Sequence, residues 1–147
     1  MSSEQITDLY VSGTRMRLRE ARPLSGGPAL LRLSRKADID AQTRLITSIY
    51  LPEDEFEVLA RSLSGKKIHK LRHRFAPKPG VVWLADEFQG ALAGLYVAEA
   101  EFKTRESMSV FTTPEFAVRE ITEDHRFTGG CLVEQGLPVE LQELLKR

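Results

Sequence analysis

The segment Thr14-Arg15-Met16-Arg17-Leu18-Arg19 alternates basic and apolar side chains. Successive side chains of a β-strand point to opposite faces, so the pattern predicts a strand with its three arginines on one face and Met16 and Leu18 on the other. A row of three cations is unfavourable unless that face meets water or an anion. The segment therefore predicts a sheet with one basic and one apolar face.

Two later segments repeat this alternation. The first has Lys70, Arg72 and Arg74 on one face of a predicted strand, and the second has Glu99 and Glu101 on one face. If these strands join in one closed sheet, the charged faces line its interior and the apolar faces turn outward under helices. We therefore predict a barrel whose interior binds a polyanion.

Length and composition restrict the class of protein. The 147 residues are enough for one domain with its own core, which we expect to span residues 1–147. Basic and acidic residues number 21 each, which disfavours nucleic-acid binding driven by overall charge. No apolar run approaches the roughly 20 residues that cross a bilayer, and the first residues lack the pattern of a secretory signal. We expect a cytoplasmic protein with no membrane partner and no specific nucleic-acid partner.

Periodicity and turn residues predict an α+β order of elements. Pro52 and the acidic residues after it favour the start of a helix, and Gly65 is expected to end that helix. The expected strands are residues 6–11, 14–19, 29–36, 43–51, 67–75, 81–88 and 95–103, and the expected helices are residues 52–65, 106–111, 128–135 and 138–146.

The arginines and the glutamate pair are the groups that suggest chemistry. Several guanidinium forks that converge suit a polyphosphate, but the same row could be an exposed strand face whose charges pair with neighbouring acids. Glu99 and Glu101 could be ion-pair partners, or could hold a divalent cation together with substrate phosphates. The polar run at residues 119–126 reads by itself as a solvated turn. Cys131 is the single cysteine, and a buried inert thiol is its expected role.

The ordered set of these motifs resembles the CYTH superfamily, the triphosphate tunnel metalloenzymes. The resemblance is carried by Arg15-x-Arg17-x-Arg19, Arg44, Lys70-x-Arg72, Asp86-x-Phe88-x-Gly90, Leu95-x-x-Ala98-Glu99-x-Glu101-Phe102 and Glu120-Ile121-Thr122-Glu123-Asp124-x-Arg126-Phe127. It implies an α+β fold built on an antiparallel β-barrel of seven to eight strands with flanking helices, a charge-lined tunnel, and Mg²⁺ or Mn²⁺ as cofactor.

The resemblance also implies roles for individual residues. Glu99 and Glu101 are expected to be catalytic and to bind the metal with Asp86 and Glu120, while Arg126 either reaches phosphate or tethers the segment that closes the tunnel end. The residues expected to bind a triphosphate are Arg15, Arg17, Arg19, Lys36, Arg44, Lys70, Arg72 and Arg126.

Two departures from the family pattern bear on the activity. The family's first strand reads Glu-x-Glu-x-Lys, and Met1 to Gln5 do not supply it, so the barrel is expected to lack a strand, to close with seven, or to borrow one. Ile46 and Ser48 stand where the family usually has acids facing the tunnel. Both changes remove carboxylates, which should weaken cation binding more than phosphate binding.

Three functions follow as expectations. The first is a metal-dependent phosphohydrolase that acts on a triphosphate-containing substrate: inorganic triphosphate, thiamine triphosphate or a nucleoside triphosphate. The second is a related module that binds polyphosphate or nucleotide without turnover. The third is an interaction protein that forms a homodimer through an open edge of its sheet.

Overall fold

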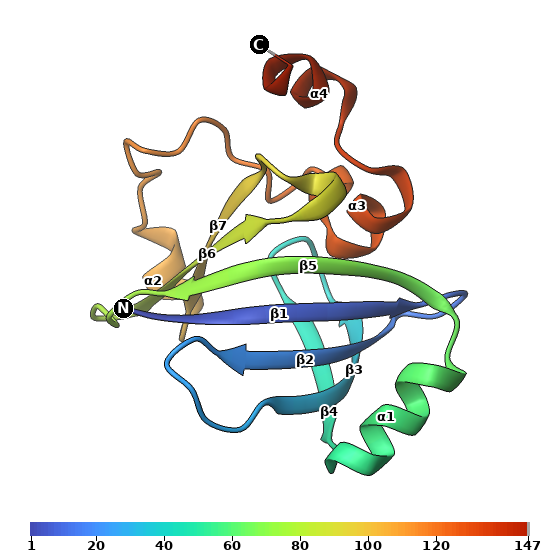
Figure 1. The fold of residues 1–147 in the computed structure, drawn as a ribbon. Coiled ribbons are helices and arrows are strands. Elements are labelled where there is room, and N and C mark those ends of the chain that lie inside the picture. The colour runs from blue at the N-terminus through green and yellow to red at the C-terminus, as the bar shows by residue number, and fades with distance from the viewer. Residues whose placement is uncertain (147) are drawn as a thin grey trace.

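The computed structural model describes residues 1–146 and contains one seven-stranded antiparallel sheet (Figure 1). Its strands follow the order β4-β3-β2-β1-β5-β6-β7. Their bounds are β1 Ser2–Val11, β2 Met16–Pro23, β3 Leu30–Asp38, β4 Arg44–Tyr50, β5 Gly65–Arg74, β6 Val81–Phe88 and β7 Tyr96–Phe102. The seven predicted strands are therefore confirmed, with β1 beginning at Ser2 instead of Ile6.

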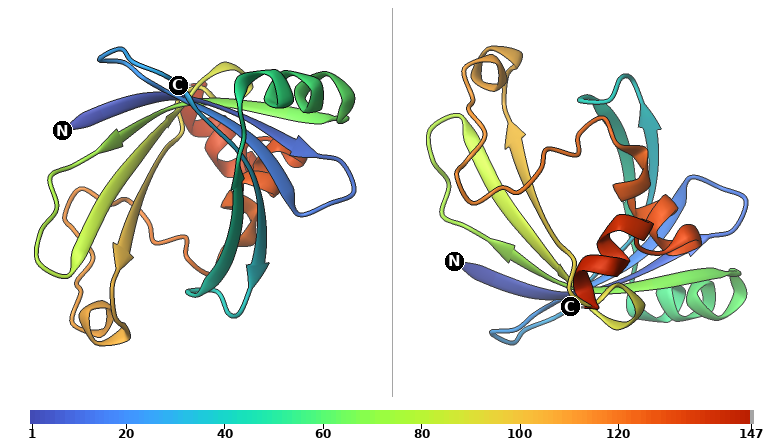
Figure 2. Two further views of the ribbon diagram at one scale, coloured as in Figure 1. Left: turned by 90° about the horizontal axis from the view of Figure 1, so that it is seen from below. Right: turned by 90° about the horizontal axis from the view of Figure 1, so that it is seen from above.

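The sheet curls into a half-barrel (Figure 2). Strand β1 lies at its centre, and β4 and β7 are its two edges. Within residues 1–146 these two edge strands do not pair with each other, so the curled sheet stays open along one side. The α+β prediction is confirmed. The barrel was expected to lack a strand, to close with seven strands or to borrow one. In residues 1–146 the sheet has seven strands and does not close into a barrel.

The predicted alternation of the arginine segment is present in β2. Leu18 and Arg19 each have 2% of their surface exposed although they point to opposite faces, because the sheet is covered on both sides there. Thr14 ends the turn that precedes this strand, where its hydroxyl donates to the carbonyl of Val11 at 2.9 Å. At Leu18 and Arg19, both faces of β2 are therefore buried.

Residues 1–146 also form four α-helices and two short 3-10 turns. Their bounds are α1 Glu53–Ser62, η1 Gly90–Leu92, α2 Arg105–Ser109, η2 His125–Phe127, α3 Gly129–Gln135 and α4 Val139–Leu145. Helix α1 lies on the convex side of the sheet, where it contacts β3, and α3 lies on the concave side against β5 (Figure 2). No helix within residues 1–146 is both long and apolar enough to cross a membrane.

The prediction that Gly65 ends the first helix was wrong. The helix ends at Ser62, with Leu63 as its C-cap, and Gly65 is instead the first residue of β5. A side chain at Gly65 would run into the backbone carbonyl of Tyr10 in β1. The glycine is therefore required by the close approach of two paired strands and not by a helix end.

An apolar cluster fixes α3 to one end of the concave face. Its buried members are Ile68, Phe88, Leu92, Leu95 and Leu132. Because Leu132 belongs to α3 and packs on Ile68 and Phe88, the concave face of β5 is the one that carries Ile68. The residues in register with it are thereby assigned to the same face.

Candidate anion-binding site

The pairing register places the predicted basic residues together on the concave face. Ile68 lies opposite Asp8, and Asp8 lies opposite Arg19. Arg72 lies opposite Asp86, two positions from the pair that Lys70 forms with Phe88. By the same alternation the concave face carries Arg15, Arg17, Arg19, Arg32, Lys36, Arg44, Lys70 and Arg72.

The first charged group on this face, the Asp8 cluster, consists of Asp8, Arg17 and Arg19. Nε and Nη2 of Arg19 each donate to a carboxylate oxygen of Asp8 at 2.7 Å, and Nε of Arg17 lies 3.7 Å from Oδ1. Asp8 is fully buried. Burial alone would raise its pKa, but the bond from Arg19 and the charges of Arg19 and Arg17 outweigh it and hold the pKa below its usual range. The carboxylate therefore stays charged.

The second group, the Asp86 cluster, consists of Lys70, Arg72 and Asp86. Nζ of Lys70 donates to Asp86 at 2.8 Å, and Arg72 donates to both oxygens at 2.7 and 2.8 Å. Burial opposes the charge on Asp86, yet the bonds and charges of Arg72 and Lys70 bring its pKa to about 2. Nη2 of Arg72 also lies 3.9 Å from Glu99. Asp86 thus orients both cations on the concave face.

Positive charge exceeds negative charge in the buried part of this face. The two clusters hold four cations against two carboxylates, and Arg32 and Lys36 add two more on β3. Nε of Arg17 and Nε of Arg32 are buried without a hydrogen-bond partner among the described residues. Burial, followed by the charge of Arg17, lowers the pKa of Lys36 to about 8. Unpartnered buried donors beside surplus positive charge indicate a place for an anion.

Sequence reasoning missed two residues of this site. Asp8 lies between Thr7 and Leu9 in a segment with the pattern of an ordinary strand, and Arg32 lies in the predicted strand at residues 29–36 with no motif that marks it. Both residues lie on the same face of the sheet as Arg17 and Arg19, because side chains alternate along each strand. This shared face can be recognised only when the pairing register of the strands is known.

Arg15 and Arg44 lie at the rim of the face. Asp38 accepts from Arg15 at 2.8 Å and lies 3.3 Å from Nε of Arg44. All three side chains are more than a third exposed, so this pairing holds the two guanidinium groups loosely. Either can turn toward an anion at small energetic cost.

The glutamate pair lies on β7 at the open edge of the sheet. Glu101 pairs with Val82 and Glu99 with Leu84, which puts both carboxylates on the concave side. Within residues 1–146 no group of three or more side chains of the types that ligate metals converges. Two carboxylates still suit Mg²⁺, which commonly takes one or two protein carboxylates and completes its shell with substrate phosphates and water. The pair therefore fits a metal that arrives with a phosphate.

The segment after β7 crosses the open side of the half-barrel and ends in α3 and α4 (Figure 2). Asp124 caps η2 and accepts from Arg126 at 2.7 Å, and Arg126 lies 2.7 Å from Glu140 of α4. This geometry favours the tethering role of Arg126. Glu120 is exposed and accepts from Thr122 at 3.2 Å, apart from the two buried clusters.

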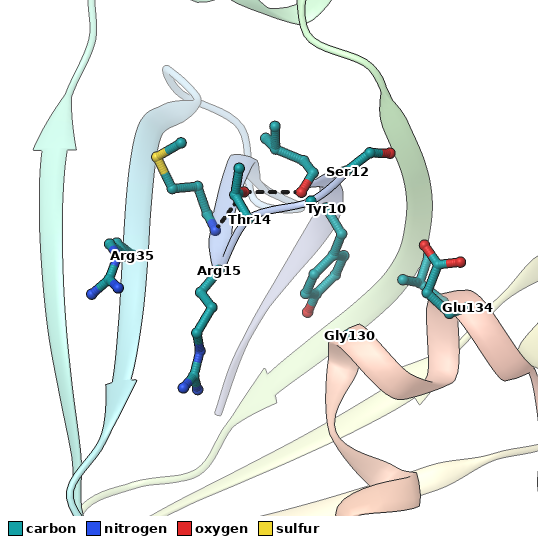
Figure 3. A pocket seen from close by; sticks show the side chains of 11 residues that line it. Tyr10, Ser12, Thr14, Arg15, Arg35, Gly130 and Glu134 are labelled. Atoms are coloured by element: carbon teal, nitrogen blue, oxygen red, sulfur yellow. Dashed lines mark hydrogen bonds between the residues drawn. The ribbon is translucent and has the colours of Figure 1, made fainter.

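A cavity of about 700 Å³ opens at the end of the concave face where α3 packs (Figure 3). It is lined by the β1–β2 turn, by Arg15 and Arg35, and by Gly130 and Glu134 of α3. In Figure 3 the side chain of Arg15 extends along this opening. The residues of the Asp8 and Asp86 clusters do not line this cavity, although Tyr10, the strand partner of Arg17, does.

Fold and site together define a curled α+β half-barrel with a basic concave face. No family model matches the sequence. An inorganic triphosphatase from Nitrosomonas europaea is 29% identical over 84 residues, which are 57% of this chain and 56% of that protein. An inorganic triphosphatase from Acetivibrio thermocellus is 34% identical over 93 residues, 63% of this chain and 58% of that protein. The chain thus matches less than three-fifths of each relative's length.

Solved structures show the same fold. The crystal structure of the inorganic triphosphatase NE1496 superposes with a TM-score of 0.58 at 22% identity, over 89% of this chain and 82% of that one. The PH1819 protein from Pyrococcus horikoshii OT3 gives a TM-score of 0.51 at 24% identity, over 74% and 69%. At these identities the similarities show the fold, and the architecture of this chain is that of the inorganic triphosphatase structure.

Proposed function

We propose that this chain binds a triphosphate on its concave face and hydrolyses it with Mg²⁺ or Mn²⁺. The observation that carries the proposal is the surplus of buried cations, with Nε of Arg17 and Nε of Arg32 lacking a hydrogen-bond partner in the described part of the chain. The relatives named inorganic triphosphatase make inorganic triphosphate the first substrate to test. Thiamine triphosphate and nucleoside triphosphates carry the same recognition group and are tested beside it.

The chain's own residues bind and orient the substrate in this proposal. Arg17 and Arg32 donate to phosphate oxygens through Nε groups that have no hydrogen-bond partner among residues 1–146. Asp86 holds the side chains of Lys70 and Arg72 in place. These cations therefore need not move to stabilise the negative charge that shifts between phosphate oxygens when water attacks in line. A divalent cation held by Glu99, Glu101 and the phosphates would supply further charge at the phosphoryl oxygens.

Phosphate release from inorganic triphosphate tests the proposal. We expect release with Mg²⁺ or Mn²⁺ and none with a chelator. In the double variant Glu99→Gln with Glu101→Gln, the metal concentration for half-maximal release should rise at least about tenfold, the scale of losses on perturbing a metal's surroundings. The matched control is Glu53→Gln with Glu55→Gln, which removes two carboxylates at the same spacing from the exposed first turn of α1 and should leave release unchanged. Release that persists in chelator would contradict the metal role.

A second function, triphosphate binding without turnover, is favoured by one observation. Ile46 and Ser48 lie on the concave face, in register with Lys36 and Ser34, and bring no carboxylate to it. Thermal stabilisation by triphosphate without phosphate release, across inorganic, thiamine and nucleoside triphosphates, would establish this second function in place of the first.

The low pKa of Lys36 makes triphosphate binding pH-dependent. Because its pKa is about 8, Lys36 loses its proton as the pH rises from 7 to 9, whereas a bound polyanion favours the protonated form. Binding near pH 8 should therefore take up a proton, and Lys36 should contribute less affinity as the pH rises. Calorimetry in buffers of different ionisation enthalpy measures the uptake. The Lys36→Met variant measures the proton uptake that comes from triphosphate itself. Equal proton uptake by the variant and the wild type would show that Lys36 is not the group that is protonated on binding.

A further inference from the structure

Strand β4 is an edge of the sheet, and within the described residues 1–146 no strand lies beside its outer backbone groups (Figure 2). The amide of Leu51 donates to Leu31 of β3, and the carbonyl of Thr43 accepts from Ile39. Since backbone groups alternate in direction along a strand, the odd-numbered positions bond to β3 and the even-numbered positions 44–50 point away from it. Four residues thus offer their amides and carbonyls to a further strand.

The side chains of β4 do not protect this edge. Leu45, Ile46, Ile49 and Tyr50 are 59%, 51%, 59% and 61% exposed. Natural sheets usually protect an edge with charges, with proline or with a bulge. The other edge, β7, carries Glu99 and Glu101, whereas the only charged residue of β4 is Arg44 at its first position. The exposed apolar surface is therefore concentrated on one of the two edges.

We propose that β4 pairs antiparallel with β4 of a second copy of this chain, about a two-fold axis at Thr47. This register pairs all seven residues and joins outward-facing backbone positions to each other, as an antiparallel ladder requires. Arg44 lies opposite Tyr50 of the partner subunit, and Ile46 lies opposite Ser48 of the partner subunit. On the other face Leu45 meets Ile49 of the partner subunit.

The strand is complementary to itself in this register. Apolar side chains meet on the convex face, each Arg44 meets an aromatic ring, and no two like charges oppose one another. A shallow depression adjoins the end of the strand on α1, where Leu51, Val58 and Leu59 extend the apolar surface and Asp54 and Glu55 complete the lining. Two seven-residue strands bury little area alone, so this extension adds to what a stable pair needs. The pairing is independent of triphosphate chemistry.

Sedimentation equilibrium, which gives the mass in solution, tests the proposal. The variants place charged residues at positions 45 and 49, which lie opposite each other across the proposed interface. The wild type should be a dimer. Leu45→Lys with Ile49→Lys sets lysine opposite lysine and should give a monomer that keeps the fold, because both side chains are exposed. Leu45→Lys with Ile49→Glu sets opposite charges across the axis and should restore the dimer in this register alone. The control, Val110→Lys with Val139→Lys, introduces two lysines at exposed apolar positions outside β4 and should remain dimeric.

A cross-link checks the axis separately. Residues at position 47 would face each other as a non-hydrogen-bonded pair, with Cα atoms roughly 4.5 Å apart, close enough for a disulfide. With Cys131→Ser, Thr47→Cys should give a disulfide dimer under mild oxidation, while Val110→Cys should not.

A monomeric wild type would overturn the proposal. If the amides of Ile46, Ser48 and Tyr50 in that monomer were nevertheless protected from hydrogen exchange, the edge would be covered by a segment of the same polypeptide. A dimer unaffected by lysines at 45 and 49 would place the interface elsewhere and would also refute it.

Discussion

Asp8→Asn should lower the free energy of unfolding by about 3–5 kcal/mol, the usual cost of removing one partner from a buried charge pair. The substitution keeps the shape of the side chain but leaves Arg17 and Arg19 without their shared anion on a covered face. Asp8 itself is fully buried, so water cannot take its place without opening the sheet. Urea or thermal unfolding followed by circular dichroism measures the loss.

The control for this variant is Asp38→Asn. Asp38 pairs with Arg15 and Arg44 at the rim, where the side chains are largely exposed, so its loss should cost less than about 1 kcal/mol. Inorganic triphosphate should stabilise Asp8→Asn more than the wild type, because the ligand replaces the missing negative charge. Equal stabilisation of both proteins would mean that the anion does not reach the Asp8 cluster.

Arg17→Met should lower kcat/KM for triphosphate by about 10²–10³-fold, the loss seen when one preorganised donor to a developing charge is removed. Arg17 is the arginine of the Asp8 cluster whose buried Nε makes no hydrogen bond to any described residue, since its contact with Asp8 is long, at 3.7 Å. Its removal should therefore affect substrate more than stability. Initial rates of phosphate release across substrate concentrations separate kcat from KM.

Arg22→Met is the matched control for this variant. Arg22 follows the arginine segment on the same strand, but its side chain is 59% exposed and pairs with Glu20. Its kcat/KM should stay within a factor of two or so of the wild type, since exposed pairs contribute little. A similar loss in both variants would point to general electrostatic attraction instead of a contact at Arg17.

Much of this fold was predictable from the sequence because the alternation is strong. The row from Arg15 to Arg19 predicted both the strand and its basic face. The positions of Lys70 and Arg72 predicted a second strand that also has a basic face. The roles of Glu99, Glu101 and Glu120 stay predictions, since they rest on the family resemblance and on a bound metal.

The remaining features depend on long-range contacts that local pattern does not specify. Asp8 acquires its role only when Arg19 lies opposite it. Gly65 resembles a helix end in sequence, and the approach of Tyr10 that requires it comes from a distant strand. Whether the sheet closes depends on its curvature and strand number, which alternation does not encode.

The central position of β1 has a consequence for folding kinetics. The Asp8 cluster forms within the hairpin of β1 and β2, and the Asp86 cluster within the hairpin of β5 and β6, so each needs only neighbouring strands. The two hairpins meet through the pairing of β1 with β5, in which Ser2 lies opposite Arg74. This pairing has an entropic cost, because it closes the loop formed by the chain between the two strands. The complete basic face therefore exists only after this late step. We expect a polyanion that contacts both clusters to slow unfolding without speeding refolding, because the two clusters share one face only after β1 has paired with β5.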